Sequence, residues 1–155
     1  YDIDAFLPKL EYRVKIFEEN RITQISNLIS NGSDIQTSVN KVFPIRVEDT
    51  LFSDKLGIKG RVDEIYKDGD TMIPLDYKGI PDAVAHQSSY RIQLASYSML
   101  IEEKYSTSVK NAKIYYTSTA SLDTFPIDNQ LRTKVLETKE KYVEGFYEYT
   151  FHDTQ

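Results

Sequence analysis

The chain has 155 residues, no cysteine and a formal net charge of −5. Its 40% hydrophobic and 28% charged residues are typical of a globular protein, and we expect residues 1–155 to form a single domain, alone or within a longer chain. The lack of cysteine excludes disulfides and thiolate metal sites, and the acidic balance argues against a protein that coats nucleic acid through bulk positive charge. No apolar run is long enough to cross a bilayer, so we expect no membrane partner and a cytoplasmic location.

The first third of the chain predicts helix followed by strand. Apolar residues recur at helical spacing over residues 2–30, and a polar run containing glycine at 31–34 ends that segment. Polar and apolar residues then alternate over residues 40–51, which predicts a strand. Pro44 lies within this strand and favours an edge position or a bulge.

Two further strands are predicted at residues 58–66 and 71–78, which are rich in β-branched, aromatic and apolar side chains. Between them, Asp68 and Gly69 form a strong hairpin signal. We therefore expect these strands to be antiparallel neighbours.

The hairpin brings two acidic residues together. With a turn at residues 68 and 69, Asp63 faces Pro74, and Asp76 lies one same-face step farther along, about 7 Å away between α-carbons. Lys78 leaves the same face as Asp76, and the main-chain carbonyl of Tyr77 lies beside the site. Carboxylates, carbonyls and waters are the ligands that Mg²⁺ and Mn²⁺ prefer, and an ammonium beside such an ion can favour deprotonation of an attacking water. These residues predict one divalent-metal site that cuts the phosphodiester backbone of DNA.

Residues 88–104 carry an apolar stripe that predicts an amphipathic helix. Gln93 and Tyr97 lie four apart and therefore on one face, where we expect them to brace Lys78, hold a metal-bound water or touch a phosphate. The preceding segment, residues 80–87, is expected to be a loop. Its His86 is interpreted as an ordinary surface residue.

The last third of the chain predicts two strands and a helix. Residues 111–118 predict a strand parallel to 71–78, because a helix connects the two. Residues 121–125 are expected to add a short strand, and Asp128 to cap a final helix. The resulting order, α-β-β-β-α-β-α, is a three-layer α/β arrangement in which helices flank a mixed sheet.

Basic residues and tyrosines have two interpretations each. A local phosphate-binding surface and a solvated mixed-charge face are both compatible with the basic residues around the motifs, which are Lys55, Lys59, Arg61, Lys78 and Arg91. Stacking on single-stranded bases is an option for several tyrosines, although packing is the interpretation we favour for Tyr115, Tyr116, Tyr147 and Tyr149.

The order Gly60-x-x-Asp63, Asp76-x-Lys78, Gln93-x-x-x-Tyr97 resembles the RecB-like branch of the PD-(D/E)XK nucleases, and within it the CRISPR-associated exonucleases. The likeness covers residues 43–146. It implies a restriction-endonuclease-like core and a Mg²⁺- or Mn²⁺-dependent exonuclease that degrades single-stranded DNA or DNA ends, in CRISPR adaptation and antiviral defence or in recombination and repair. By this resemblance, the metal ligands are Asp63, Asp76 and the Tyr77 carbonyl, the catalytic lysine is Lys78, and Gln93 and Tyr97 form the supporting motif.

Two features that the resemblance implies are missing from this chain. The CRISPR-associated relatives usually carry four cysteines that hold an iron–sulfur cluster, so no such cluster is expected here. They also usually carry a histidine ligand on the first helix, roughly where Glu18 and Glu19 stand. We favour a solvated role for both glutamates, with Glu19 retained as a candidate metal ligand.

These departures leave alternatives open. One is a catalytically weak or inactive module of the same fold that binds DNA ends or acts as a scaffold. Another is a nuclease for flaps or structured DNA inside a larger helicase assembly. The expected partners are DNA, single-stranded or at its ends, and a CRISPR integrase or a helicase.

Overall fold

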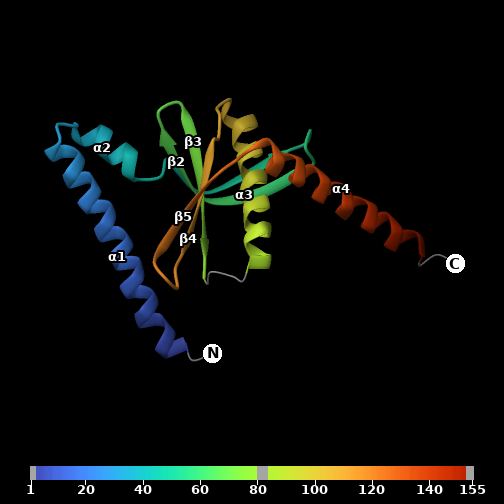
Figure 1. Ribbon diagram of the computed structural model, residues 1–155, viewed down its shortest axis with the longest axis horizontal. Coiled ribbons are helices and arrows are strands. Elements are labelled where there is room, and N and C mark those ends of the chain that lie inside the picture. The colour runs from blue at the N-terminus through green and yellow to red at the C-terminus, as the bar shows by residue number, and fades with distance from the viewer. Residues whose placement is uncertain (1–2, 80–83, 153–155) are drawn as a thin grey trace.

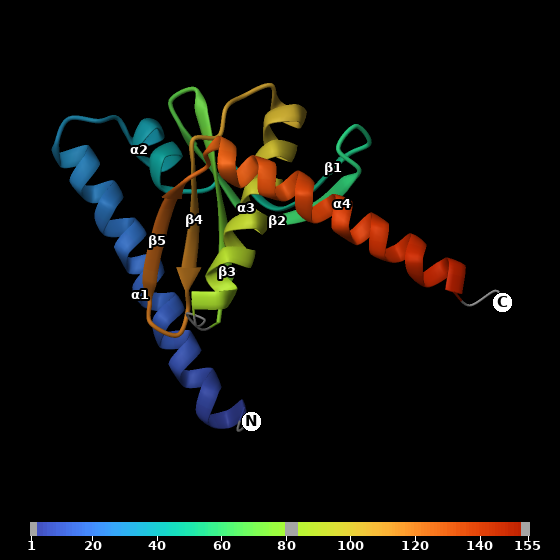
Figure 2. The same ribbon diagram turned by 45° about the vertical axis from the view of Figure 1, so that its right-hand side comes forward.

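The computed structural model describes residues 3–79 and 84–152 and arranges them in three layers (Figure 1). A mixed five-stranded sheet lies between α1 and α2 on one side and α3 and α4 on the other (Figure 2). In chain order the elements are α1 (Ile3–Ser30), α2 (Ile35–Val42), β1 (Arg46–Ser53), β2 (Ile58–Asp68), β3 (Thr71–Lys78), α3 (Val84–Tyr105), β4 (Asn111–Tyr116), β5 (Ser121–Pro126) and α4 (Asn129–His152). The expected three-layer α/β fold is confirmed. Within the described ranges, no helix has the length and apolarity that a bilayer span requires.

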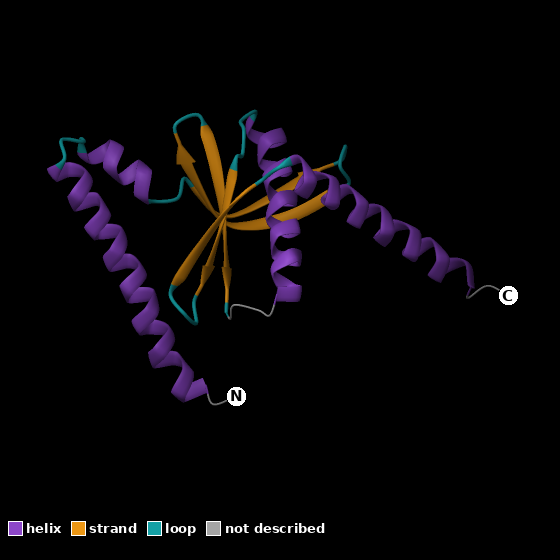
Figure 3. Ribbon diagram, in the orientation of Figure 1, coloured by secondary structure: helices purple, strands orange, loops and turns teal. Residues whose placement is uncertain are grey.

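The strands lie in the sheet in their sequence order, β1-β2-β3-β4-β5. Neighbouring strands are antiparallel except β3 and β4, which are parallel because α3 connects them (Figure 3). The predicted parallel strand at residues 111–118 and the short strand after it are therefore confirmed.

Helix α2 occupies the first part of the segment that was expected to be a strand, residues 40–51. The side chain of Asp34 accepts a hydrogen bond from the main-chain N–H of Thr37 at 2.9 Å, which caps the start of this helix. Pro44 follows the helix, and strand β1 begins at Arg46. The prediction failed because the capping contact and packing outweighed a short alternating pattern.

Helix α3 begins earlier than expected and includes the second half of the segment predicted as a loop, residues 80–87. His86 therefore lies within a helix, while residues 80–83 lie outside the described part of the chain. The final helix is capped as expected, since the Asp128 carboxylate accepts a hydrogen bond from the N–H of Leu131 at 2.8 Å.

The β2–β3 hairpin has a different register from the one predicted. Gly69, with a φ of 58°, takes the first position of a two-residue turn, where glycine adopts the left-handed conformation at little cost. Pro74 consequently pairs with Ile65 and not with Asp63. Glu64 pairs with Leu75, the last regular pair toward the site, so Asp63 and Asp76 are the next residues on the two strands.

The main core lies between the sheet and α3, with a smaller contribution from α4. Its side chains are apolar and buried, and they include Val62, Ile65, Leu94, Ala95, Leu100, Ile101, Ala112, Ile114 and Val135. A second, smaller cluster lies on the other face, where Phe17 of α1 packs on Tyr77 and Tyr115 at ring-centroid distances of 6.1 and 4.3 Å. Tyr115 and Tyr116 are buried, which supports packing over base stacking for both.

A buried ionic contact attaches α1 to the sheet. Arg21 is 7% exposed, and its guanidinium donates to the Glu64 carboxylate of β2 at 2.7 Å and also to the Tyr66 hydroxyl. The Tyr66 hydroxyl donates to the same carboxylate at 2.5 Å, and Glu18 of α1 forms a second ion pair with Arg21 at 2.7 Å. No local sequence pattern predicts this network, in which Arg21 and Glu64 are 43 positions apart.

Replacing Arg21 tests whether this contact stabilises the fold. Arg21→Met leaves Glu64 buried without its counter-charge, and we expect the free energy of unfolding to fall by about 3–5 kcal/mol. Arg61→Met is the matched control, because Arg61 pairs with Glu48 at 2.8 Å with both side chains more than half exposed. Denaturant unfolding should show a change within about 1 kcal/mol for the control, and equal losses would contradict the assignment.

Candidate active site at the end of strand β3

Asp76 and Lys78 form an ion pair at the end of β3. Lys78 Nζ lies 2.6 Å from Asp76 Oδ2, as expected for side chains two residues apart on one strand face. Asp76 is buried, with 4% exposure, and its Oδ2 atom has no aligned hydrogen-bond partner. The close ammonium thus neutralises this oxygen without fully satisfying it.

Asp63 is held next to this pair by the main chain of β3. Its Oδ2 atom accepts a hydrogen bond from the N–H of Tyr77 at 2.8 Å. The regular pairing of β2 with β3 extends only as far as Glu64 and Leu75. Beyond that pair, the Asp63 carboxylate replaces a main-chain carbonyl as the acceptor for the N–H of Tyr77. The structure therefore brings the carboxylates of Asp63 and Asp76 together, with the Tyr77 main chain between them.

Helix α3 supplies a chain of contacts that orients Lys78. Lys78 Nζ donates a hydrogen bond to Gln93 Oε1 at 3.1 Å, and Gln93 Nε2 donates to the Tyr97 hydroxyl at 2.7 Å. Tyr90, which sequence reasoning missed as a site residue, lies with its ring centroid 4.6 Å from the Lys78 ammonium. Its position three residues before Gln93 was the available signal, since residues at this spacing share a helix face.

Gly60 makes room for this arrangement. Tyr97 is 8% exposed, and a β-carbon at position 60 would overlap its ring. The glycine of the Gly-x-x-Asp motif thus allows β2 and α3 to approach at the residue that supports Gln93.

Burial raises the pKa of Asp76 above its ordinary value. The nearby Lys78 ammonium opposes this increase, and the neighbouring Asp63 carboxylate adds to it. Keeping Asp76 ionised therefore costs free energy, because it is buried and lies beside a second carboxylate. A second positive charge at the two carboxylates would remove much of this cost.

The residues present fit a divalent cation that keeps several waters. Asp76 Oδ2 is a buried oxygen without an aligned donor, Asp63 lies beside it, and the Tyr77 carbonyl belongs to the same stretch of main chain. Across the described ranges, no group of three or more His, Asp or Glu side chains is placed to hold a metal ion. Any ion here would thus rely on two carboxylates, main-chain oxygen, water and substrate, which suits Mg²⁺ or Mn²⁺.

The structure does not bring Glu19 to this site. Its carboxylate lies 3.8 Å from Lys15 on the same helix and its side chain is 60% exposed, which matches the solvated role favoured from the sequence. Two residues of the candidate basic surface have other partners. Arg61 pairs with Glu48, and the guanidinium of Arg91 lies 4.6 Å from the ring centroid of Phe125. The side chain of His86 is outside the described part of the chain.

The glycine contact generates a first test of this site. Gly60→Ala should displace the Tyr97 ring and lower the free energy of unfolding by about 1–3 kcal/mol through overpacking. Gly79→Ala is the matched control, because a β-carbon there meets nothing within 4 Å, and its effect should stay within about 0.5 kcal/mol. Thermal unfolding checks both variants, and an unaffected Gly60→Ala protein would contradict the close approach.

The raised pKa of Asp76 generates a second test, in metal-free buffer. A carboxyl whose pKa is higher in the folded state loses folding free energy as pH rises through that window, so ionised Asp76 destabilises the fold at neutral pH. Asp76→Asn should therefore raise the melting temperature at pH 7 and change it little at acidic pH.

The matched control for Asp76→Asn is Asp49→Asn. Burial alone would raise the pKa of Asp49, but hydrogen bonds from Tyr105 and Lys104 lower it overall, so ionised Asp49 stabilises the fold. This control should lower the melting temperature at pH 7. Shifts of the same sign in both variants would show that burial does not dominate at Asp76.

Comparison with known proteins finds two similar fusion proteins. Two proteins described as a CRISPR-associated exonuclease Cas4/endonuclease Cas1 fusion are similar: that of Leptospira interrogans serogroup Icterohaemorrhagiae serovar Lai (strain 56601) is 33% identical over 92 residues, and that of Myxococcus xanthus (strain DK1622) is 32% identical over 95. The matches cover 56% and 58% of this chain but only 17% of each fusion protein, so the chain spans a small part of their length.

The fold also has a counterpart among solved structures. The crystal structure of a candidate exonuclease from Eubacterium rectale superposes with a TM-score of 0.51 over 90% of this chain and 55% of that one, at 11% sequence identity. This likeness concerns the fold alone. The pattern of the PD-(D/E)XK nuclease superfamily matches residues 9–151, nearly the whole chain, and the protein therefore belongs to the PD-(D/E)XK nuclease superfamily.

Proposed function

We propose that this protein is a Mg²⁺- or Mn²⁺-dependent deoxyribonuclease that acts as an exonuclease on single-stranded DNA or DNA ends. The observation that carries the proposal is the grouping of Asp63, Asp76 and Lys78 at the end of β3. Two adjacent carboxylates, of which Asp76 is buried, and an ammonium are the groups that phosphodiester hydrolysis with a divalent cation requires.

Each of the grouped residues has a distinct role in this proposal. Asp63, Asp76 and the Tyr77 carbonyl would hold the cation, which when bound lowers the pKa of an attacking water and neutralises charge on the phosphate. Lys78 lies beside the carboxylates, where its ammonium would orient that water and favour loss of its proton.

Gln93 and Tyr97 would act as positioning residues for Lys78. Gln93 Oε1 accepts from the ammonium, and its Nε2 atom is fixed by the Tyr97 hydroxyl, so the lysine retains one partner if a cation takes over Asp76 Oδ2. A lysine held in this way loses little conformational freedom when the substrate binds.

The relatives support the choice of exonuclease over other nucleases. Both fusion proteins are described as a CRISPR-associated exonuclease joined to an endonuclease, and the segment similar to this chain covers about a sixth of each. We propose that residues 1–155 form one nuclease domain that works in the cytoplasm with DNA and with a CRISPR integrase or a helicase. These relatives support a proposed role in spacer adaptation and antiviral defence, with recombination and repair as the other setting.

A second candidate function is a DNA-end-binding or scaffolding module of the same fold with little or no turnover. It is favoured by one observation: in the described segments, only two carboxylates converge on the site and no third acidic or histidine side chain joins them. Such a module would bind DNA ends but would not cleave them in Mg²⁺ or Mn²⁺.

Cleavage assays on three variants test the proposed activity. Asp63→Asn, Asp76→Asn and Lys78→Met should each reduce the cleavage of labelled DNA in Mg²⁺ or Mn²⁺ by at least about a hundredfold. Asp49→Asn and Lys104→Met are matched controls. Lys104 Nζ and Asp49 Oδ1 form a similar ion pair, 3.0 Å apart, outside the candidate site, so both variants should retain cleavage.

The same preparations separate the two candidate functions. Calorimetry with Mn²⁺ should give saturable binding to the unaltered protein and none to Asp76→Asn, and single-stranded, duplex and flap substrates should identify the preferred DNA. DNA binding without cleavage and without saturable Mn²⁺ binding would support the module and refute the enzyme. Full activity in a folded Lys78→Met variant would refute the role of Lys78.

A further inference from the structure

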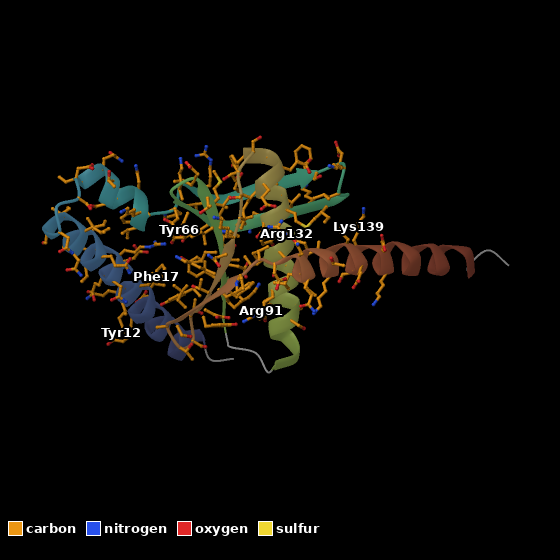
Figure 4. All side chains as sticks on the ribbon, turned by 45° about the horizontal axis from the view of Figure 1, so that its top comes forward. Tyr12, Phe17, Tyr66, Arg91, Arg132 and Lys139 are labelled. Atoms are coloured by element: carbon orange, nitrogen blue, oxygen red, sulfur yellow. The ribbon has the colours of Figure 1, made fainter. Side chains whose placement is uncertain are left out.

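The face of the sheet that α1 covers contains a small hollow, on the side away from α3, near Phe17 and Tyr66 (Figure 4). Its volume is about 110 Å³, and its walls include Arg21 of α1, Lys41 of α2 and Lys113 of β4. We propose that this hollow is an anion site that binds a phosphate group, separate from the carboxylates at the end of β3.

Lys113 is the half-buried positive charge of this hollow that has no ion-pair partner among the described residues. It lies on β4 between Leu75 and Thr124 of the adjacent strands and is half-buried. In the part of the chain that the structure describes, Lys113 forms no ion pair, and its ammonium lies 5.4 Å from the ring centroid of Tyr66. Burial lowers the pKa of Lys113, an effect that Asp68 only partly opposes. A bound anion would supply the acceptor that this ammonium lacks.

Two carboxylates on the α1 side of the sheet, Glu64 and Glu18, are already engaged. Glu64 accepts from Arg21 at 2.7 Å and from the Tyr66 hydroxyl at 2.5 Å, and Glu18 pairs with Arg21 from its own helix. These contacts neutralise Arg21, and among the described residues no carboxylate lies within ion-pair distance of Lys113, on which Asp68 acts only from farther away. The buried network also fixes the position of Arg21, so one wall of the hollow is rigid.

The rest of the hollow suits a small oxyanion that enters from solvent. Lys41 and Gln24 are exposed and stand at its edge, where they can donate hydrogen bonds to oxygens that remain outside. Ammonium and guanidinium groups form strong, charge-assisted bonds with phosphate oxygens. The volume accommodates a phosphate group but not a whole nucleotide, so a base or sugar attached to the phosphate would remain outside.

The phosphate group has two possible sources. One is a free anion, such as phosphate or pyrophosphate, and the other is the terminal phosphate of a nucleic-acid strand. Titration calorimetry in EDTA removes any contribution of a metal ion at the other site. The probes are inorganic phosphate, pyrophosphate, a 5′-phosphorylated dinucleotide and the same dinucleotide with a 5′-hydroxyl. A glutamate-rich peptide serves as the carboxylate comparison.

Lys113→Met and Lys41→Met should each weaken the binding of the phosphorylated probes by roughly tenfold or more. Lys139→Met is the matched control, because this lysine lies on α4, away from the hollow, as Figure 4 shows. Asp76→Asn should also bind phosphate normally, which separates this site from the proposed nuclease site. Preference for the phosphorylated dinucleotide over inorganic phosphate would identify a strand terminus as the source, and the reverse preference would identify a free anion.

The melting temperature gives a second measurement, because a ligand that binds only the folded state stabilises it by an amount set by its concentration and its dissociation constant. Phosphate should raise the melting temperature for the unaltered protein and for Lys139→Met, but not for Lys113→Met. If Lys113→Met does not fold, the exposed Lys41→Met variant still decides the outcome. Absence of saturable phosphate binding, equal binding by all the lysine variants, or tighter binding of the peptide at these same lysines would overturn the proposal.

Discussion

The contact between Asp76 and Lys78 is the constraint on which the candidate site depends. A carboxylate that is 4% exposed, with an oxygen that no aligned donor satisfies, is costly in a folded protein. The ammonium 2.6 Å away reduces this cost, yet burial still raises the pKa of the acid. The fold thus maintains an electrostatically unfavourable group in a fixed place, which is typical of functional sites.

The surrounding elements explain how this group is held. Strand β3 lies in the middle of the sheet, with β2 on one side and β4 on the other, so Asp76 cannot move out to solvent. Helix α3 fixes the lysine through Gln93 and Tyr97, and Gly60 lets that helix approach β2. On the opposite face, α1 is anchored by the Arg21 network, which leaves a basic hollow beside it. The two faces of one sheet thus present an acidic site and a basic site.

Periodicity and turn chemistry predicted most of the sheet and the helix that faces it. Local patterns predicted the three strands around the hairpin, the parallel strand that follows α3, and the pairing of Gln93 with Tyr97. The hairpin register was missed by two residues, because the sequence does not reveal which two residues around Gly69 form the turn. Helix α2 was missed because an eight-residue segment carries little periodic signal. The Arg21 network and the surroundings of Lys113 depend on contacts between distant segments, which no local pattern contains.

The most direct test of the shared-cation account is a crystal structure of the protein grown with Mn²⁺, with the ion located by its anomalous scattering. The account predicts a peak between the carboxylates of Asp63 and Asp76, about 2.0–2.4 Å from an oxygen of each, with Lys78 still bonded to Gln93. A fully occupied Mn²⁺ elsewhere, with the Asp76–Lys78 ion pair unchanged, would contradict it.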